Sequence, residues 1–91
     1  MWPRRGHLEI MANILEIVSH GGATKTSIVY KANLNFTIVQ RYLDHLRSID
    51  MIELSDGGGT SVYRLTTKGR EALPAVRRTM ELLLAEELLA S

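Results

Sequence analysis

The spacing of the apolar residues changes near Asp50, and this change constrains the fold more than any other feature of the sequence. Before it, apolar residues recur at steps of three and four, which predicts three helices, at about residues 7–20, 25–32 and 36–49. After it, the runs MIELS and SVYRL flank DGGGT, which predicts two short strands and a glycine-rich hairpin turn. A last helix is predicted at about residues 67–89. The chain is therefore expected to be mainly α with a small β-hairpin.

Residues at the ends of the predicted helices support this order. Gly21 and Gly22 end the first helical pattern. A residue able to cap free backbone amides precedes each later helix, namely Thr24, Asn35 and Thr66. The short connection NLN predicts a helix-turn-helix, with Asn33 in a left-handed conformation at the exit of the second helix. With the hairpin that follows, the order α-α-α-β-β-α is that of a winged helix-turn-helix with a long C-terminal helix.

The length and composition point to one small intracellular domain. A chain of 91 residues, 45% of them hydrophobic, is long enough for one core and too short for two. It has no cysteine, and a secreted domain of this size would usually need disulfides. The basic start MWPRRG leads into a segment with Glu9, Asn13 and Glu16, which is too polar for a secretory or membrane-spanning segment. We expect a soluble, cytoplasmic protein.

The sequence does not predict an enzyme. His7, His20 and His45 are isolated from other side chains at metal-ligand spacing. There is no Ser-His-acid arrangement with a nucleophile elbow, and the glycine run does not match the phosphate-binding motif G-x-x-x-x-G-K-[ST]. We therefore expect neither a metal nor a cofactor.

Charge is distributed unevenly along the chain. Residues 1–70 contain nine Lys or Arg and six Asp or Glu, whereas residues 71–91 contain two and four. The first segment is thus positive and the second negative. A positive body suggests a polyanionic partner, although so small a surplus is also common in proteins that bind none.

The run YKANLNFTIVQRYLDHLRSIDMIE, followed by YRLTTKG, carries a resemblance to a known family. It resembles the small archaeal winged-helix DNA-binding proteins, which include transcriptional regulators and chromatin-associated proteins that dimerise through a long C-terminal helix. The resemblance covers residues 24–69 in detail. It implies a DNA-binding domain at residues 1–70, continuous with a dimerisation helix at 71–91. Two residues depart from the pattern: Asp50 stands where glycine is usual, and Pro74 interrupts the last helix.

Helix 36–49 carries a face of hydrogen-bonding side chains. Its buried stripe is predicted to be Val39, Leu43 and Leu46, which turns the polar residues outward. The residues predicted to contact DNA are Lys25, Thr26, Lys31, Asn35, Thr37, Gln40, Arg41, Asp44, His45 and Arg64. Gln40 and Arg41 are the predicted base readers, since Gln pairs bidentately with adenine and Arg with guanine. Lys25, at a helix start, is predicted to contact phosphate. The alternative is an ordinary solvated surface.

The last helix has more apolar residues than one small core can cover. Its broad stripe consists of Leu73, Val76, Met80, Leu83, Leu84 and Leu88. Part of the helix is expected to project from the domain, where an exposed stripe would mark an interface. A homodimer formed by this helix, similar to a short coiled coil, is predicted. The alternative is that the helix folds back on its own domain, and Pro74 is expected to cause a kink or a restart near Leu73.

Three functional interpretations stay open at this point. The first is a homodimeric transcriptional regulator that places its third helix in the major groove of double-stranded DNA. The second is a nucleoid-associated architectural protein on the same fold, which binds DNA with little sequence preference. The third is a winged-helix module that binds proteins and does not bind DNA, which the weak charge surplus and Asp44 favour. The sequence does not indicate an effector ligand.

Overall fold

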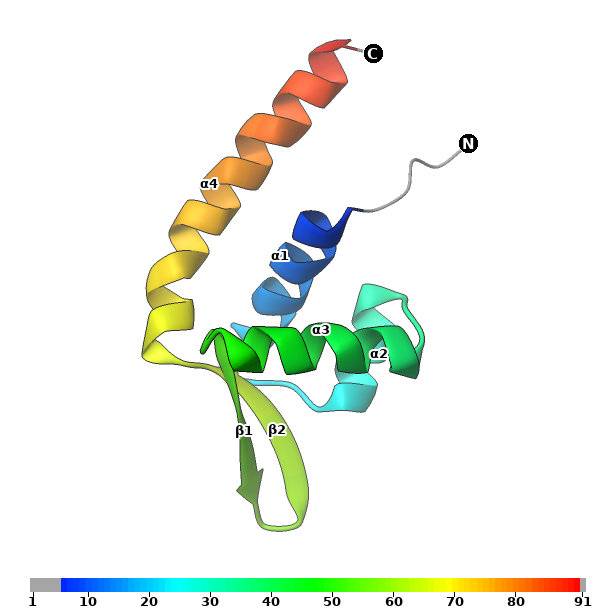
Figure 1. The fold of residues 1–91 in the computed structure, drawn as a ribbon, viewed down its shortest axis with the longest axis vertical. Coiled ribbons are helices and arrows are strands. Elements are labelled where there is room, and N and C mark those ends of the chain that lie inside the picture. Colours follow the sequence, from blue (N-terminus) through cyan, green and yellow to red (C-terminus); the bar gives the residue numbers. More distant parts are fainter. Residues whose placement is uncertain (1–5, 91) are drawn as a thin grey trace.

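The computed structural model describes the backbone of residues 6–90 and the side chains of residues 6–56 and 58–83. Its elements, in order, are α1 (His7–Val18), α2 (Lys25–Ala32), α3 (Phe36–Ser48), β1 (Ile52–Gly57), β2 (Thr60–Leu65) and α4 (Thr67–Ala90). Figure 1 shows α1, α2 and α3 packed together, with the hairpin and α4 extending in opposite directions. The predicted fold class and element order are confirmed.

The helix ends follow from local hydrogen bonds. The side chain of Thr24 accepts a bond from the Ser27 amide at 3.2 Å, and that of Asn35 accepts one from the Ile38 amide at 2.8 Å. Asn33 has φ 56° and ψ 49°, the predicted left-handed exit from α2. Thr24 begins α2, whereas Asn33 and Asn35 set the turn between α2 and α3, so the helix-turn-helix is built by its own connecting segment.

The core lies where α1, α2 and α3 meet the base of the hairpin. Its largest fully buried side chains are Ile14, Ile28, Leu43, Leu46, Val18 and Val39. The predicted stripe of α3 is thus confirmed, with Val39 and Leu43 at 0% exposure. Because this stripe fixes the rotation of α3 about its own axis, it also decides which side chains of α3 face solvent.

The hairpin forms a wing with a tight turn. Its register pairs Gly57 with Thr60, so only Gly58 and Gly59 connect the strands, with φ of 65° and 91°. Positive φ at both central residues is the signature of a type I′ turn, which matches the twist of the strands. At the base of the wing, Tyr63 exchanges two backbone hydrogen bonds with Ala23, of 2.9 and 2.8 Å, which ties the wing to the loop after α1.

The segment LTTKG closes the corner between α3 and α4. Thr66 caps α4, as predicted, because its hydroxyl oxygen accepts a bond from the Gly69 amide at 3.0 Å, and the same hydroxyl donates to the Asp50 carbonyl. Lys68 Nζ donates to the Ile49 carbonyl at 2.8 Å, where α3 ends. These side chains therefore hold the end of α3 against the start of α4.

Two backbone positions make this corner possible. Asp50 has φ 62°, so it adopts the left-handed conformation that glycine usually supplies, and the predicted tolerance of this departure is confirmed. At Gly69 an added Cβ would lie 2.1 Å from the Met51 carbonyl oxygen. Glycine is required there because the two backbones approach too closely for any side chain.

Helix α4 is one continuous helix through Pro74, so the predicted restart near Leu73 does not occur. Leu73 is 6% exposed and Val76 packs against the same core, whereas Leu82 and Leu83 are about half exposed, at 52% and 49%. The first turns of α4 therefore complete the core, and the helix then extends away from the globule, as Figure 1 shows. The predicted projection of this helix is confirmed.

Candidate nucleic-acid interface

Helix α3 presents three different sides. The buried stripe faces the core. Thr37, Arg41 and Asp44 are exposed on the opposite side, and Gln40 lies half-buried between them and α2. We call these four residues the outward face of α3. The third side faces the N-terminal end of α1 and includes Tyr42.

Three side chains of the predicted interface form a continuous hydrogen-bonded chain. Lys25 Nζ donates to Gln40 Oε1 at 2.6 Å, and Gln40 Nε2 donates to Asp44 Oδ1 at 2.8 Å. An ammonium group can only donate and a carboxylate can only accept, so these partners fix which end of the Gln40 amide faces which neighbour. The chain therefore connects the start of α2 to the outward face of α3 and orients Gln40.

The oriented amide keeps part of its hydrogen-bonding capacity. A glutamine side chain has two N–H donors and two acceptor lone pairs. Lys25 uses one acceptor position and Asp44 uses one donor, which leaves one of each on Gln40. One donor and one acceptor are the pair needed to bind the N7 and N6 groups of adenine.

Lys25, which was predicted to contact phosphate, has two partners within the protein. Besides its bond to Gln40, its Nζ lies 5.8 Å from the centroid of the Phe36 ring. Phe36 is 52% exposed, and it was missed as a candidate surface residue because its spacing from Val39 and Leu43 fits the buried stripe. Its position directly after the capping Asn35, as the first residue of α3, was the available signal.

The other predicted contact residues are not part of the hydrogen-bonded chain formed by Lys25, Gln40 and Asp44. Thr26 and Lys31 are exposed on α2, and the side-chain oxygen Oδ1 of Asn35 is engaged in capping α3. Arg64 Nη1 donates to the Gly21 carbonyl at 3.0 Å, so this wing arginine is held at the loop after α1. His45 is exposed on the side of α3 that faces α1. The structure thus joins Lys25, Gln40 and Asp44 by hydrogen bonds, and the remaining predicted residues do not take part in these bonds.

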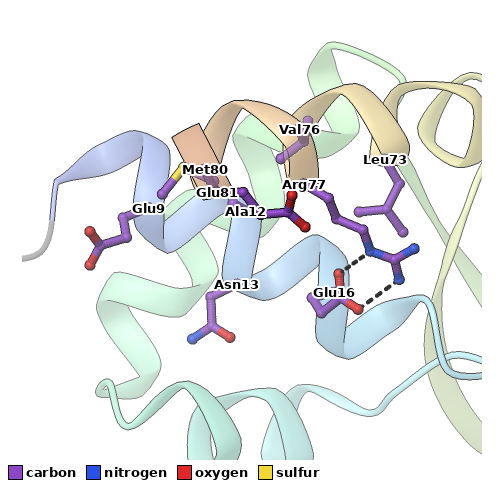
Figure 2. A pocket seen from close by; sticks show the side chains of 9 residues that line it. All are labelled: Glu9, Ala12, Asn13, Glu16, Leu73, Val76, Arg77, Met80 and Glu81. Carbon is purple, nitrogen blue, oxygen red and sulfur yellow. Dashed lines mark hydrogen bonds and ion pairs between the residues drawn. The ribbon is translucent and has the colours of Figure 1, made fainter. Parts of the chain in front are cut away.

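A groove between α1 and α4 contains the first part of the predicted dimer stripe. Its volume is about 400 Å³, and Figure 2 shows Leu73, Val76 and Met80 of α4 beside α1. Leu73 is buried within its own chain, so it contributes to this core rather than to a dimer surface. Of the rest of the stripe, Leu83 is exposed, and the side chains of Leu84 and Leu88 lie outside the described residues.

One ion pair spans this groove. Arg77 Nε and Nη2 donate to the two carboxylate oxygens of Glu16 at 2.8 and 2.7 Å, as Figure 2 shows. These hydrogen bonds lower the pKa of the Glu16 carboxyl below its ordinary value, against a smaller opposing effect of burial. The bidentate pair therefore joins α4 to α1 at the edge of the core.

Among the described side chains, those of residues 6–56 and 58–83, no three His, Asp or Glu gather in a way that could hold a metal ion. The described helices also include none that is long and apolar enough to cross a membrane.

Comparison with known proteins is consistent with this geometry. The chain is 31% identical over 80 residues to the uncharacterized protein MJ0290 of Methanocaldococcus jannaschii; the match covers 88% of this chain but 36% of that protein, so the chain spans about a third of its relative. The uncharacterized protein MJ0287 of the same organism is 28% identical over 80 residues, which are 88% of this chain and 78% of that one.

Solved structures share the whole arrangement. The crystal structure of Sso10a-2, a DNA-binding protein from Sulfolobus solfataricus, has a TM-score of 0.75 at 25% identity and covers 94% of both chains. The transcriptional regulator BldR of the same organism superposes with a TM-score of 0.81 over 90% of this chain and 61% of its own, but at 15% identity this likeness concerns the fold alone. The winged helix-turn-helix family profile matches residues 4–84. The chain therefore belongs to the winged helix-turn-helix family.

Proposed function

We propose that this protein binds double-stranded DNA as a transcriptional regulator, with α3 in the major groove. The observation that carries the proposal is the oriented amide of Gln40, which the bonds to Lys25 and Asp44 leave with one donor and one acceptor. The likeness to Sso10a-2, a DNA-binding protein, supports the same partner for this chain.

Three of the four side chains of the outward face have a chemical role in this proposal. Gln40 pairs with adenine, and the exposed Arg41, one residue further along, pairs with guanine. Asp44 accepts from Gln40, so its carboxylate orients the amide that reads the base. The start of α2 and the wing approach the backbone, where Thr26 and Arg64 contact phosphate and set the register.

We further propose that α4 pairs with α4 of a second copy. The exposed Leu82 and Leu83 lie on the part of α4 that extends beyond the core, and a two-fold dimer would cover the same residues on both copies. Two copies of α3 would then read two half-sites, which raises affinity through the high effective concentration of the second contact.

The test is selection of bound fragments from a genomic library by the purified full chain, followed by measurement of affinity for the enriched and competitor DNA. A regulator should enrich a sequence with two related half-sites and prefer it by at least about a thousandfold. Uniform retention of fragments would instead support the architectural alternative. Absence of DNA binding at low salt would overturn the proposal and favour the protein-interaction module.

A further inference from the structure

A small pocket lies at the corner where α1 ends, β2 ends and α4 begins. Its volume is about 100 Å³, below the roughly 300 to 1,000 Å³ of pockets for drug-sized ligands, so it suits a ligand of only a few atoms. Its lining includes Arg64 of β2, Arg70 of α4, and Gly21 and Gly22 of the loop after α1. None of the described lining residues is acidic. We call it the wing-base pocket.

Both guanidinium groups of the wing-base pocket are held by backbone carbonyl groups. Arg64 Nη1 donates to the Gly21 carbonyl at 3.0 Å, and Arg70 Nη1 donates to the Leu65 carbonyl at 3.0 Å. Arg70 Nη2 also donates to Thr67 Oγ1 at 3.4 Å. Carbonyl and hydroxyl oxygens orient a guanidinium without neutralising it, because they carry no net charge. Two oriented positive charges therefore line one small pocket.

Gly22 makes the position of Arg64 possible. A Cβ added at Gly22 would lie 3.1 Å from Arg64 Cγ and 2.7 Å from Val62 Cγ1, so the stem of Arg64 runs close over the loop. Gly22 also has φ 94°, a conformation that residues with a side chain rarely adopt. The loop thus leaves the space through which Arg64 reaches the Gly21 carbonyl from the neighbouring strand.

The two arginines have no carboxylate partner within the described side chains. Glu53 stands opposite Arg64 in the register of the hairpin, where an ion pair across the strands would be possible. The ion pairs of the described part of the chain nevertheless include neither Arg64 nor Arg70. A guanidinium has five N–H donors, of which Arg64 uses one and Arg70 uses two, so four and three remain. The pocket therefore offers both charge and donors to an anion.

We propose that the wing-base pocket binds a tetrahedral dianion, either free phosphate or the phosphate group of a small monoester, between Arg64 and Arg70. Guanidinium groups bind phosphate oxygens through parallel pairs of N–H bonds, and two such groups match two negative charges. A phosphodiester of the DNA backbone carries one negative charge, so this site differs from the proposed contact of Arg64 with DNA. The bound dianion joins β2 to α4 beside the loop after α1, and so stabilises the base of the wing.

The test is titration of the full chain at pH 8 with inorganic phosphate, methyl phosphate and dimethyl phosphate, with ionic strength held constant by chloride. Binding is followed by calorimetry and by ¹³C–¹H spectra. We expect saturable shifts at the Cα of Gly21 and Gly22 and at the Cδ of Arg64 and Arg70. Either dianion should bind about tenfold more tightly than the monoanionic dimethyl phosphate. Tighter binding of methyl phosphate than of inorganic phosphate would assign the pocket to a monoester, and the reverse order would assign it to the free ion.

Two substitutions locate the site. Arg64→Met and Arg70→Met each remove one guanidinium whose side chain is exposed, so the fold should persist by circular dichroism, and each should remove the preference for a dianion. Arg78→Met is the matched control, since it removes the same charge from α4 outside the pocket and should bind phosphate like the wild-type chain. Equal affinity for phosphate and dimethyl phosphate, shifts that do not saturate, or an equal loss in Arg78→Met overturns the proposal. None of these measurements contains DNA, so a chain that binds DNA but not phosphate refutes the pocket alone.

Discussion

Lys25→Met removes the ammonium group that orients Gln40 while keeping a side chain of similar length. In the wild-type chain the Gln40 amide is held at both ends, by Lys25 at 2.6 Å and by Asp44 at 2.8 Å. Without Lys25 the amide is held at its nitrogen only, so its orientation must be fixed at the moment when it pairs with a base. We therefore expect the substitution to reduce the preference for adenine at the position that Gln40 contacts.

The size of the effect follows from these bonds. Ordering one flexible side chain at an interface costs about 0.5 to 1.5 kcal/mol. The preference for adenine should thus fall about two- to tenfold, but it should not vanish, because a bidentate contact discriminates by about 1 to 3 kcal/mol. Loss of a charge near the DNA should also weaken binding to every sequence and reduce the salt slope by about one unit.

The assay is fluorescence anisotropy with the enriched site and with a copy in which the adenine is replaced, at several salt concentrations. Lys31→Met is the matched control, since it removes the same charge from the exposed surface of α2 and should weaken binding to both DNAs equally. In a chain that already carries Gln40→Ala, Lys25→Met should weaken binding to both DNAs equally, as Lys31→Met does in the wild-type chain. If Lys25→Met lowers the affinity for both DNAs by the same factor when Gln40 is present, the hydrogen bonds from Lys25 through Gln40 to Asp44 play no part in base recognition.

Other regions of the fold make three further predictions. Gly69→Ala should lower the free energy of unfolding in urea by about 1 to 3 kcal/mol or more, because its Cβ would meet a backbone oxygen at 2.1 Å. Gly6→Ala, whose Cβ would lie in open space, should cost about 1 kcal/mol or less, the loss expected at the N-cap of α1. The lowered pKa of Glu16 stabilises the fold above the ordinary carboxyl pKa of 4.5, and this contribution is lost as pH falls through the folded-state pKa. Arg77→Met should therefore remove part of the acid dependence of unfolding, and an unchanged profile relative to Arg78→Met would show that the ion pair contributes nothing. A chain ending at Arg78 should stay folded by circular dichroism but sediment as a monomer, and continued dimerisation would exclude the rest of α4 as the dimer contact.

Features that depend on a few neighbouring residues were predictable from the sequence. Thr24 and Asn35 cap helices because each oxygen reaches an amide three residues later. Asn33 and Asp50 adopt left-handed conformations because their side chains tolerate them better than most. The buried stripe of α3 was predictable because helical geometry alone fixes which residues share a face. Together these features determine the fold class.

Contacts between elements were not predictable in this way. Lys25 and Gln40 are 15 residues apart, and their contact depends on the angle at which α2 meets α3. Helical periodicity places Gln40 near the edge of the polar face, but it does not identify the neighbour across the turn. The same limit applies to Arg64, whose bond to the Gly21 carbonyl joins residues 43 positions apart. The contacts of individual side chains therefore needed the structure.

The apolar stripe of α4 shows that a single pattern in the sequence can include both core residues and exposed residues. Leu73 and Leu83 belong to one stripe, yet Leu73 is 6% exposed and Leu83 is 49% exposed. The difference arises because α1 is only long enough to cover the first turns of α4, and a helix of 24 residues extends well beyond it. Loss of a buried leucine such as Leu73 costs about 2 to 5 kcal/mol in every chain. Loss of Leu83 costs little in one chain, but in a two-fold dimer each substitution removes the same contact twice. In the proposed dimer, the residues of α4 that stabilise the fold and those that contact the second copy would therefore be different, and Arg77, which bonds to Glu16, would lie close to the boundary between them.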